Sequence, residues 1–457
     1  MEQKNNPRTL NAWAFYDWAN SVYNLTITTA IFPIYFLSAT EAAFDGEILD
    51  FFGMSIKNDV LYSYSVSFSF LIIVVLSPLL SGVADYSGRK KLFMQIFTYI
   101  GGFSCISLYF FTGENIEYGI IYFILASVGY AGALVFYNGF LPEIATPDRF
   151  DSISARGYSL GYLGSVILLI ISIITIEMPQ LFFDVDGRIQ ELIASGLAEA
   201  EATKEATAHF KLMATKLSFL CVGIWWVVFA QIPFFILKDK PVSHDIDRKH
   251  LFTKGFKELQ KAWGNIKVMP TIKGFLGSFF FYSMGVQTVM VLAPLFGEKE
   301  IQLDTAAMIK LVLILQIIAI PGAYLFAWIS KKKGNKFSLM TMLVLWVGIC
   351  FGAFFTYTPN QFYILACFVG MSMGGIQSLS RSTYSKLLPK GTEDTASFFS
   401  FYDVTEKVAI VIGTASFGFI SDISSMRDSA LVLTVYFLLG IFVLYKTFIP
   451  FVKEENR

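Results

Sequence analysis

The sequence predicts an all-α integral membrane protein in which about twelve transmembrane helices form two pseudo-symmetric six-helix bundles. The first reason is composition: of the 457 residues, 55% are hydrophobic and only 15% are charged, whereas soluble domains carry roughly a quarter charged residues. The second is length, because apolar runs of roughly 20 residues, enough to cross a bilayer as a helix, recur about twelve times. The third is an internal repeat, since motifs of the first half recur in the second half at a nearly constant offset.

The predicted spans follow one another along the whole chain. Closed β-barrels are the other structures that cross bilayers, but their strands are short and alternate polar with apolar residues, whereas these runs are long and uniformly apolar. The predicted limits are 13–37, 60–84, 92–113, 118–141, 157–177, 216–237, 271–296, 306–330, 338–357, 362–386, 397–420 and 429–451.

Lysine and arginine in the short loops predict the orientation of the chain. With a cytosolic N-terminus, the inner loops contain the basic clusters at 89–91, 149–156 and 331–336, while the facing loops 113–117 and 358–361 contain no lysine or arginine. Cytosolic loops carry the excess of positive charge, so both termini are predicted to be cytosolic. No cleavage site follows the short polar N-terminus, so no removable signal peptide is expected. The composition, rich in Ile, Phe and Lys, favours a bacterial inner membrane, with a vacuolar membrane as the alternative.

Two connecting segments are longer than the other loops. Residues 178–215 are expected outside the membrane as a helical surface cap, with a partner or substrate site as the alternative. Residues 238–270 are expected to be a cytosolic linker with an amphipathic basic helix, suited to an anionic membrane surface. This linker separates the predicted six-helix units 1–237 and 271–457. Its apolar positions are Phe252, Phe256, Leu259, Trp263 and Ile266, and its basic positions are Lys254, Lys257, Lys261 and Lys267.

The sequence contains no pattern that indicates a metal, a cofactor or nucleic acid as a ligand. The net charge is zero, and no phosphate-binding nucleotide loop is present, so ATP is not expected to drive the protein directly. The stretch "DVDGR" at 184–188 resembles part of a calcium loop but lacks the remaining ligands. The cysteines are expected to be small core residues; they are Cys105, Cys221, Cys350 and Cys367. The histidines all lie in polar connecting segments; they are His209, His244 and His250.

Two pairs of motifs establish the repeat between the halves. Gly88, within "SGVADYSGRKK" at 81–91, aligns with Gly334, within "AWISKKKGNK" at 327–336, at an offset of 246 residues. The pattern Tyr-x-x-x-Leu-Pro at 137–142 recurs at 384–389, an offset of 247 residues. Because the two offsets agree within one residue, they support a duplicated six-helix unit.

The turn "ADYSGRKK" at 84–91 resembles the cytosolic loop signature of the major facilitator superfamily, with Ser81 where that signature has a glycine. The resemblance implies that Asp85 lies near the positive N-terminus of span 11 and acts as a latch on the closed cytosolic side. Gly88 permits the tight reversal, and Arg89 belongs to the basic cluster near lipid headgroups. Further gating residues implied by the resemblance are Glu143, Arg149 and Arg156.

Three further stretches resemble the vacuole effluxer family, which contains autophagy-related amino-acid exporters and bacterial relatives: "FYDWANSVYN" at 15–24, "FYNGFLPEIA" at 136–145 and "SARGYSLGYLGS" at 154–165. This resemblance implies a secondary transporter, not an enzyme, that exports a small solute, with amino acids as the leading class. The alternatives are export of another metabolite or a drug, and a receptor or scaffold without transport. The protein is expected to function as a monomer in the bilayer.

Span 1 carries polar residues that an isolated membrane helix would not tolerate. Asp17, Asn20, Asn24 and Thr28 are spaced by three, four and four residues, which places them on one face of a regular helix. Such a stripe is expected to face the bundle interior or a water-filled cavity. Interhelical hydrogen bonding near the helix start is the alternative role.

Span 11 carries three ionisable residues within about three turns. Asp403 and Lys407 are four residues apart and are expected to pair on one face, which leaves Glu406 beside like charge. The arrangement indicates a proton-responsive site or a pair that binds a zwitterion, with a charge network between helix ends as the alternative. With no histidine in the spans, the candidates for proton coupling are Asp17, Asp403 and Glu406, and sodium coupling would use similar ligands.

The remaining candidates lie in spans 7 and 10. Tyr282 and Gln287 are candidate pocket residues in span 7, and Gln377 is one in span 10. Arg381, near the cytosolic end of span 10, is expected to pair with Asp403 or Glu406, or to face the headgroups. We expect gating or pairing to be its role.

Overall fold

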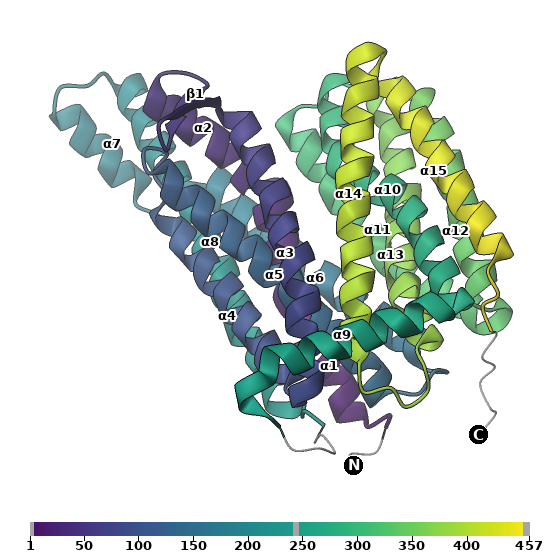
Figure 1. The fold of residues 1–457 in the computed structure, drawn as a ribbon. Helices are drawn as coiled ribbons and strands as arrows, with labels where there is room; N and C mark the ends of the chain where they lie inside the picture. The colour runs from purple at the N-terminus through teal and green to yellow at the C-terminus, as the bar shows by residue number, and fades with distance from the viewer. Residues whose placement is uncertain (1–3, 241–245, 451–457) are drawn as a thin grey trace.

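The computed structural model describes residues 4–240 and 246–450 as two helical bundles that lie side by side (Figure 1). The first contains α1 (Pro7–Val22), a π-helix (Tyr23–Ala30), α2 (Phe32–Phe44), α3 (Asn58–Ser87), α4 (Lys90–Ser107), α5 (Ile116–Ile144), α6 (Phe150–Glu177), α7 (Val185–Ala194) and α8 (Glu199–Ile236). The second contains α10 (Pro270–Lys299), α11 (Thr305–Lys333), α12 (Asn335–Phe354), α13 (Pro359–Leu387), α14 (Thr395–Ile423) and α15 (Met426–Lys446), and α9 (Leu251–Val268) connects the two. The short elements are 3₁₀-helices at Leu108–Phe110, Pro179–Leu181 and Arg248–His250, and the strands β1 (Ile48–Phe51) and β2 (Met54–Lys57).

The predicted fold class and span number are confirmed. Among the described residues, eleven helices are long and apolar enough to cross a membrane, or twelve when the bent first segment counts as one span. Most helices extend a few residues beyond the predicted apolar limits, because a helix continues through its polar ends to the next capping position. The last span is shorter than predicted, since α15 ends at Lys446 and residue 451 lies outside the described residues.

The first span differs most from its prediction. It covers 7–44 instead of 13–37, and the two parts are bent by 44° at Ile31. The amide of Ile31 donates to the carbonyl of Thr26, five residues earlier, and Pro33 lies in the first turn of α2, where its missing N–H is tolerated. A π-helix has a wider turn than 3.6 residues, so the spacing of a regular helix does not apply from Tyr23 onward. Asn20 is fully buried, whereas Asn24 is exposed.

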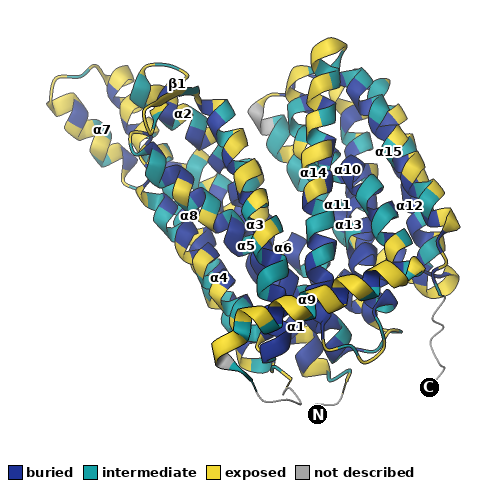
Figure 2. Cartoon of the chain, viewed as in Figure 1, coloured by how far each residue is buried: buried dark blue, intermediate teal, exposed yellow. Residues whose placement is uncertain are grey.

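Each bundle has its own apolar core. Most buried apolar residues of the first 237 positions form one cluster, and most of those from Ala262 onward form another. In Figure 2 the buried residues lie inside the bundles and many exposed ones lie on their outer surfaces. Several outward residues are large and apolar, such as Ile224, Val228 and Phe235 of α8 and Val344 of α12. Lipid tails cover such surfaces without the cost that water would impose.

The side of the molecule that carries α9 and both chain ends is called the linker side below (Figure 1). As predicted, the linker contains a helix, and α9 crosses this side beneath both bundles. It packs tightly on α3, since a Cβ added at Gly82 would lie 2.2 Å from the carbonyl oxygen of Gly255. His244 of the linker lies outside the described residues.

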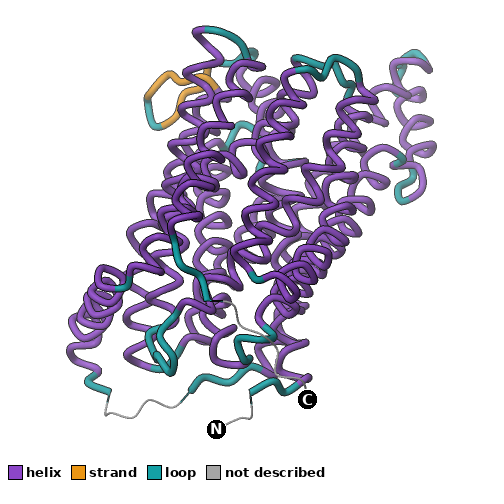
Figure 3. Tube along the Cα trace, turned by 90° about the vertical axis from the view of Figure 1, so that its right-hand side faces the viewer, coloured by secondary structure: helices purple, strands orange, loops and turns teal. Residues whose placement is uncertain are grey.

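The opposite end carries the hairpin β1–β2, which was not predicted, and α7 (Figures 1 and 3). The segment 178–215 is largely helical, as expected, but only its first half forms a separate cap. From Glu199 onward it belongs to α8, which continues without interruption into the span. Val185 and Leu192 of α7 pack on Ala202 and Ala206 of α8.

Candidate functional site

A first contact between the bundles joins α3 to the start of α14. The Asp85 carboxylate accepts hydrogen bonds from the backbone amides of Ala396 (3.2 Å) and Ser397 (2.7 Å). Unpaired amides at a helix N-terminus favour an anion, so Asp85 lies where the resemblance placed it. Gly88, with φ of +63°, ends α3 in the left-handed conformation that the tight reversal requires.

Lys90, not Arg89, supplies the buried positive charge of this contact. Its ammonium lies 3.3 Å from Asp85, donates to Thr395 Oγ1 at 2.6 Å, and donates to the carboxylate of Glu143. Glu143, which the resemblance implied as a gating residue, is therefore part of the contact.

Three of the four arginines predicted as gating residues lie outside this contact, and the fourth, Arg381, lies deeper between the bundles. Arg89, Arg149 and Arg156 have exposed side chains, and Arg156 bonds only to Asn11 among the described hydrogen bonds. The sequence shows where the basic residues lie, but charge alone does not tell which of their side chains turns toward the other bundle.

A second contact, absent from the predictions, centres on Asp151 in the first turn of α6. Its carboxylate accepts from Ser330 (2.8 Å), Asn335 (2.9 Å), Ser382 (2.7 Å) and Lys386 (2.7 Å), all in the second bundle. At the repeat offset of 246, Asp151 corresponds to Ser397, and Lys331 corresponds to Asp85. In the first contact the acid lies at the end of α3 and binds the start of α14. In the second contact the acid lies at the start of α6 and binds the end of α11. The repeat, applied to the start of α6 as well as to the loop after α11, could have indicated this contact.

Deeper between the bundles, Arg381 of α13 inserts into the first bundle. Both terminal nitrogens of its guanidinium donate to Asp17 Oδ2 at 3.2 Å, and its Nε donates to Ser154 at 2.9 Å. Its guanidinium carbon lies 4.8 Å from the ring centre of Trp13 and 4.2 Å from that of Tyr158. The expected pairing with Asp403 or Glu406 is therefore wrong, because Arg381 faces α1 and α6 instead of α14.

The charged residues of span 11 form a cluster on α14. Lys407 Nζ lies 3.3 Å from Asp403 Oδ1 and 3.0 Å from Glu406 Oε2, so Asp403 and Lys407 pair as predicted and Glu406 shares the same ammonium. Gln287 of α10 donates to Glu406 Oε1 at 2.9 Å. Asp403 Oδ2 is buried without a described hydrogen-bond partner. Two carboxylates share one ammonium, so the cluster holds one negative charge in excess when both are ionised.

The other predicted pocket residues make no described hydrogen bond to this cluster. Tyr282 bonds to Ser380 (2.7 Å), and Gln377 accepts from Tyr162 of the first bundle (2.6 Å). Asn20 is buried, and its Nδ2 has no described hydrogen-bond partner.

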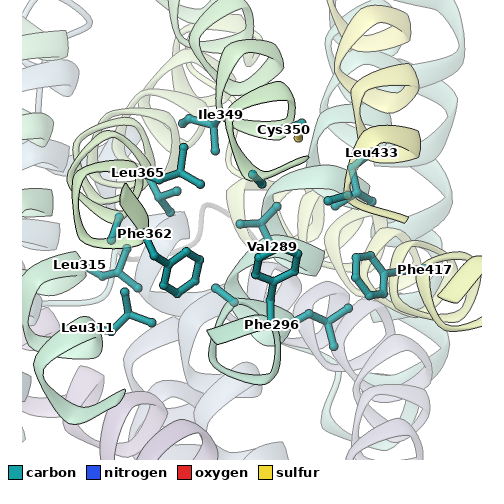
Figure 4. A pocket seen from close by; sticks show the side chains of 16 residues that line it. Val289, Phe296, Leu311, Leu315, Ile349, Cys350, Phe362, Leu365, Phe417 and Leu433 are labelled. Carbon is teal, nitrogen blue, oxygen red and sulfur yellow. The ribbon is translucent and has the colours of Figure 1, made fainter. Parts of the chain in front are cut away.

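An apolar cavity of about 60 Å³ lies inside the second bundle, between residues such as Val289, Phe296, Phe362 and Phe417 (Figure 4). Its lining offers no charged group to a polar solute, so we do not assign the functional site to it. No group of three or more His, Cys, Asp or Glu side chains suited to a metal occurs in 4–240 and 246–450.

The described hydrogen bonds between the bundles run from the Tyr162–Gln377 pair to the linker side, and the ribbons diverge toward the opposite side (Figure 1). In this conformation the two bundles therefore meet on the linker side.

A titrating pair lies beside the first contact. Asp394, directly before α14, accepts from Lys261 of α9 at 2.9 Å. Burial raises the pKa of Asp394 from 3.8 to about 6, against the opposing effect of Lys261. Because the folded form binds the proton more tightly, this group stabilises the fold at low pH and loses that contribution as pH rises through about 6.

We expect the Tm of the native chain in detergent, relative to that of Asp394→Asn, to rise as pH falls from 7 to 5. A constant difference between the two chains would contradict this.

Comparisons with known proteins agree with this architecture. Residues 5–454 match the model of the "Vacuole effluxer Atg22 like" family. The chain belongs to this family. The Uncharacterized MFS-type transporter YxiO of Bacillus subtilis is 30% identical over 448 residues, covering 98% of this chain and 95% of the relative. Autophagy-related protein 22 of Vanderwaltozyma polyspora is 28% identical over 436 residues, covering 83% and 76%.

Solved structures confirm the major facilitator fold of this Atg22-like chain. The transporter FucP in the outward conformation aligns with a TM-score of 0.64 at 12% identity, covering 96% of this chain and 98% of FucP. The human organic anion transporter MFSD10 aligns with a TM-score of 0.63 at 11% identity, covering 97% and 100%. The fold, together with the family and the YxiO relative, makes the chain a multi-pass membrane transporter for a small molecule rather than an enzyme.

Proposed function

We propose that this chain exports an amine-bearing small solute, with amino acids as the leading class, from a bacterial cytosol across the inner membrane. The observation that carries the proposal is the α14 cluster, in which two carboxylates share Lys407 and one buried oxygen of Asp403 has no described partner. A site with an excess negative charge and a free acceptor favours a cation, such as a substrate ammonium. Export is supported by the family's description as a vacuole effluxer.

We assign the linker side to the cytosol, following the excess of lysine and arginine in its loops. Transport then proceeds by alternating access: the linker-side contacts break as the opposite side closes, and the site between the bundles changes sides. Glu406, whose side chain is 23% exposed, is more accessible than Asp403 at 8%. We therefore favour Glu406 as the proton acceptor when transport is coupled to protons, with the chain acting as a monomer.

Counterflow of labelled amino acids in proteoliposomes tests this proposal. The native chain is expected to exchange at least one amino acid. Glu406→Gln is expected to reduce that exchange by roughly tenfold or more, because hydrogen bonds to a charged group contribute about 1.5–3 kcal/mol. Asp422→Asn is the matched control, since this exposed carboxylate lies near the other end of α14, and it is expected to stay within about twofold. Folded protein that exchanges none of the amino acids would exclude this substrate class, and normal exchange by Glu406→Gln would exclude the site.

A further inference from the structure

A groove of about 590 Å³ lies on the linker side between α9, α10 and α14. Its volume falls in the range of ligand pockets, roughly 300–1,000 Å³. Most of its lining is apolar, and the Trp263 ring centre lies 5.2 Å from that of Phe401. The lining residues are Phe256, Leu259, Gln260, Trp263, Leu276, Phe401, Val404 and Thr405.

Two exposed lysines, Lys267 of α9 and Lys273 of α10, lie beside the corner of this groove where the two helices meet. Phe256, Gln260, Trp263 and Lys267 are spaced by four, three and four residues, so Lys267 shares the helix face that lines the groove. Its ammonium lies 5.3 Å from the ring centre of Trp263. On α10, Lys273 lies three residues before Leu276 and therefore on the same side of that helix. The groove is thus apolar along its length and positively charged at one end.

The position of the groove explains why its apolar residues are tolerated. Helices α10 and α14 cross the membrane, and the groove lies at their linker-side ends beside α9. Amphipathic helices at such a level bury their apolar face at the boundary between headgroups and acyl chains. Phe256 and Trp263 remain 49% and 45% exposed in the protein alone, so a lipid is the occupant that this environment supplies.

We propose that this groove binds one anionic phospholipid, with an acyl chain along Trp263, Leu276 and Phe401 and the phosphate between Lys267 and Lys273. Charge complementarity selects the anionic lipid, since α9 carries four lysines against one glutamate, Glu258. The bound lipid would hold α9 against α14, whose first amides bind Asp85. Occupancy therefore stabilises the closed linker side.

Native mass spectrometry of the full chain with added phosphatidylglycerol tests the site. Lys267→Gln/Lys273→Gln is expected to weaken binding by about tenfold or more, because each lysine contributes part of the electrostatic attraction to the anionic headgroup. Val404→Phe, which fills the groove without changing the charge, is expected to weaken binding as well. Lys254→Gln/Lys257→Gln is the matched control: it removes equal charge from the other face of α9 and is expected to change binding by less than about twofold.

Two comparisons identify the source of the phosphate and the role of charge. Phosphatidylcholine is expected to bind more weakly than phosphatidylglycerol, and free glycerol phosphate is expected not to compete. Equal losses in the two double-lysine variants would mean diffuse attraction to α9 and would overturn the proposal. Equal binding of the two lipids, displacement by glycerol phosphate, or unchanged binding by folded Val404→Phe would also overturn it.

Discussion

Arg381→Met is expected to destabilise the closed conformation by about 3–5 kcal/mol, the typical cost of removing one partner of a buried ion pair. The Arg381 and Asp17 side chains are only 2% and 5% exposed, so water cannot replace the lost guanidinium. Asp17 would keep a hydrogen bond from Tyr137 but lose its counter-charge. We expect a large fall in the Tm of the purified chain.

A double variant separates charge from packing. Asp17→Asn/Arg381→Met removes both charges and is expected to recover a large part of the lost stability, since replacing a whole buried pair is often nearly neutral. Arg427→Met is the comparison for a more accessible pair, because Arg427 and Glu300 are 14% and 26% exposed, and a smaller loss is expected. A double variant no more stable than Arg381→Met would show that packing of the arginine, rather than the ion pair, carries the effect.

Asp85→Asn is expected to shift the conformational equilibrium toward an open linker side by about 1.5–3 kcal/mol, roughly a 10- to 100-fold change in populations. The substitution removes the anion from the N-terminus of α14 and weakens the contact with Lys90. Spin labels at the exposed positions Arg149 and Lys390, one on each bundle, measure the separation on the linker side after replacement of the four native cysteines.

The expected result is a larger population of long distances in Asp85→Asn than in the unsubstituted labelled chain. Asp148→Asn is the control, since this linker-side carboxylate has no described bond to the second bundle. An unchanged distance distribution in Asp85→Asn would mean that the other contacts, around Asp151 and Arg381, are sufficient to hold the bundles together.

Features set by local sequence were predictable from the sequence. The spans follow from the length of apolar runs, and α9 follows from the alternation of apolar and basic residues at helical spacing. Asp85 and Gly88 belong to one short motif whose turn geometry is local, so the resemblance placed them correctly. Asp403 and Lys407 also paired as expected, because residues four apart on one helix are neighbours whatever surrounds them.

The tertiary structure alone decided which side chains meet across the two bundles. Arg381 pairs with Asp17, 364 positions away, and Asp151 binds residues 179 to 235 positions away. In span 1 the sequence predicted neither the π-helix at Tyr23–Ala30 nor that Asn20 is buried while Asn24 is exposed. Hydrophobic pattern fixes that a helix crosses the membrane, but its rotation and depth are set by packing against the other helices. The rotation and depth of each helix therefore determine which partner each buried charge meets.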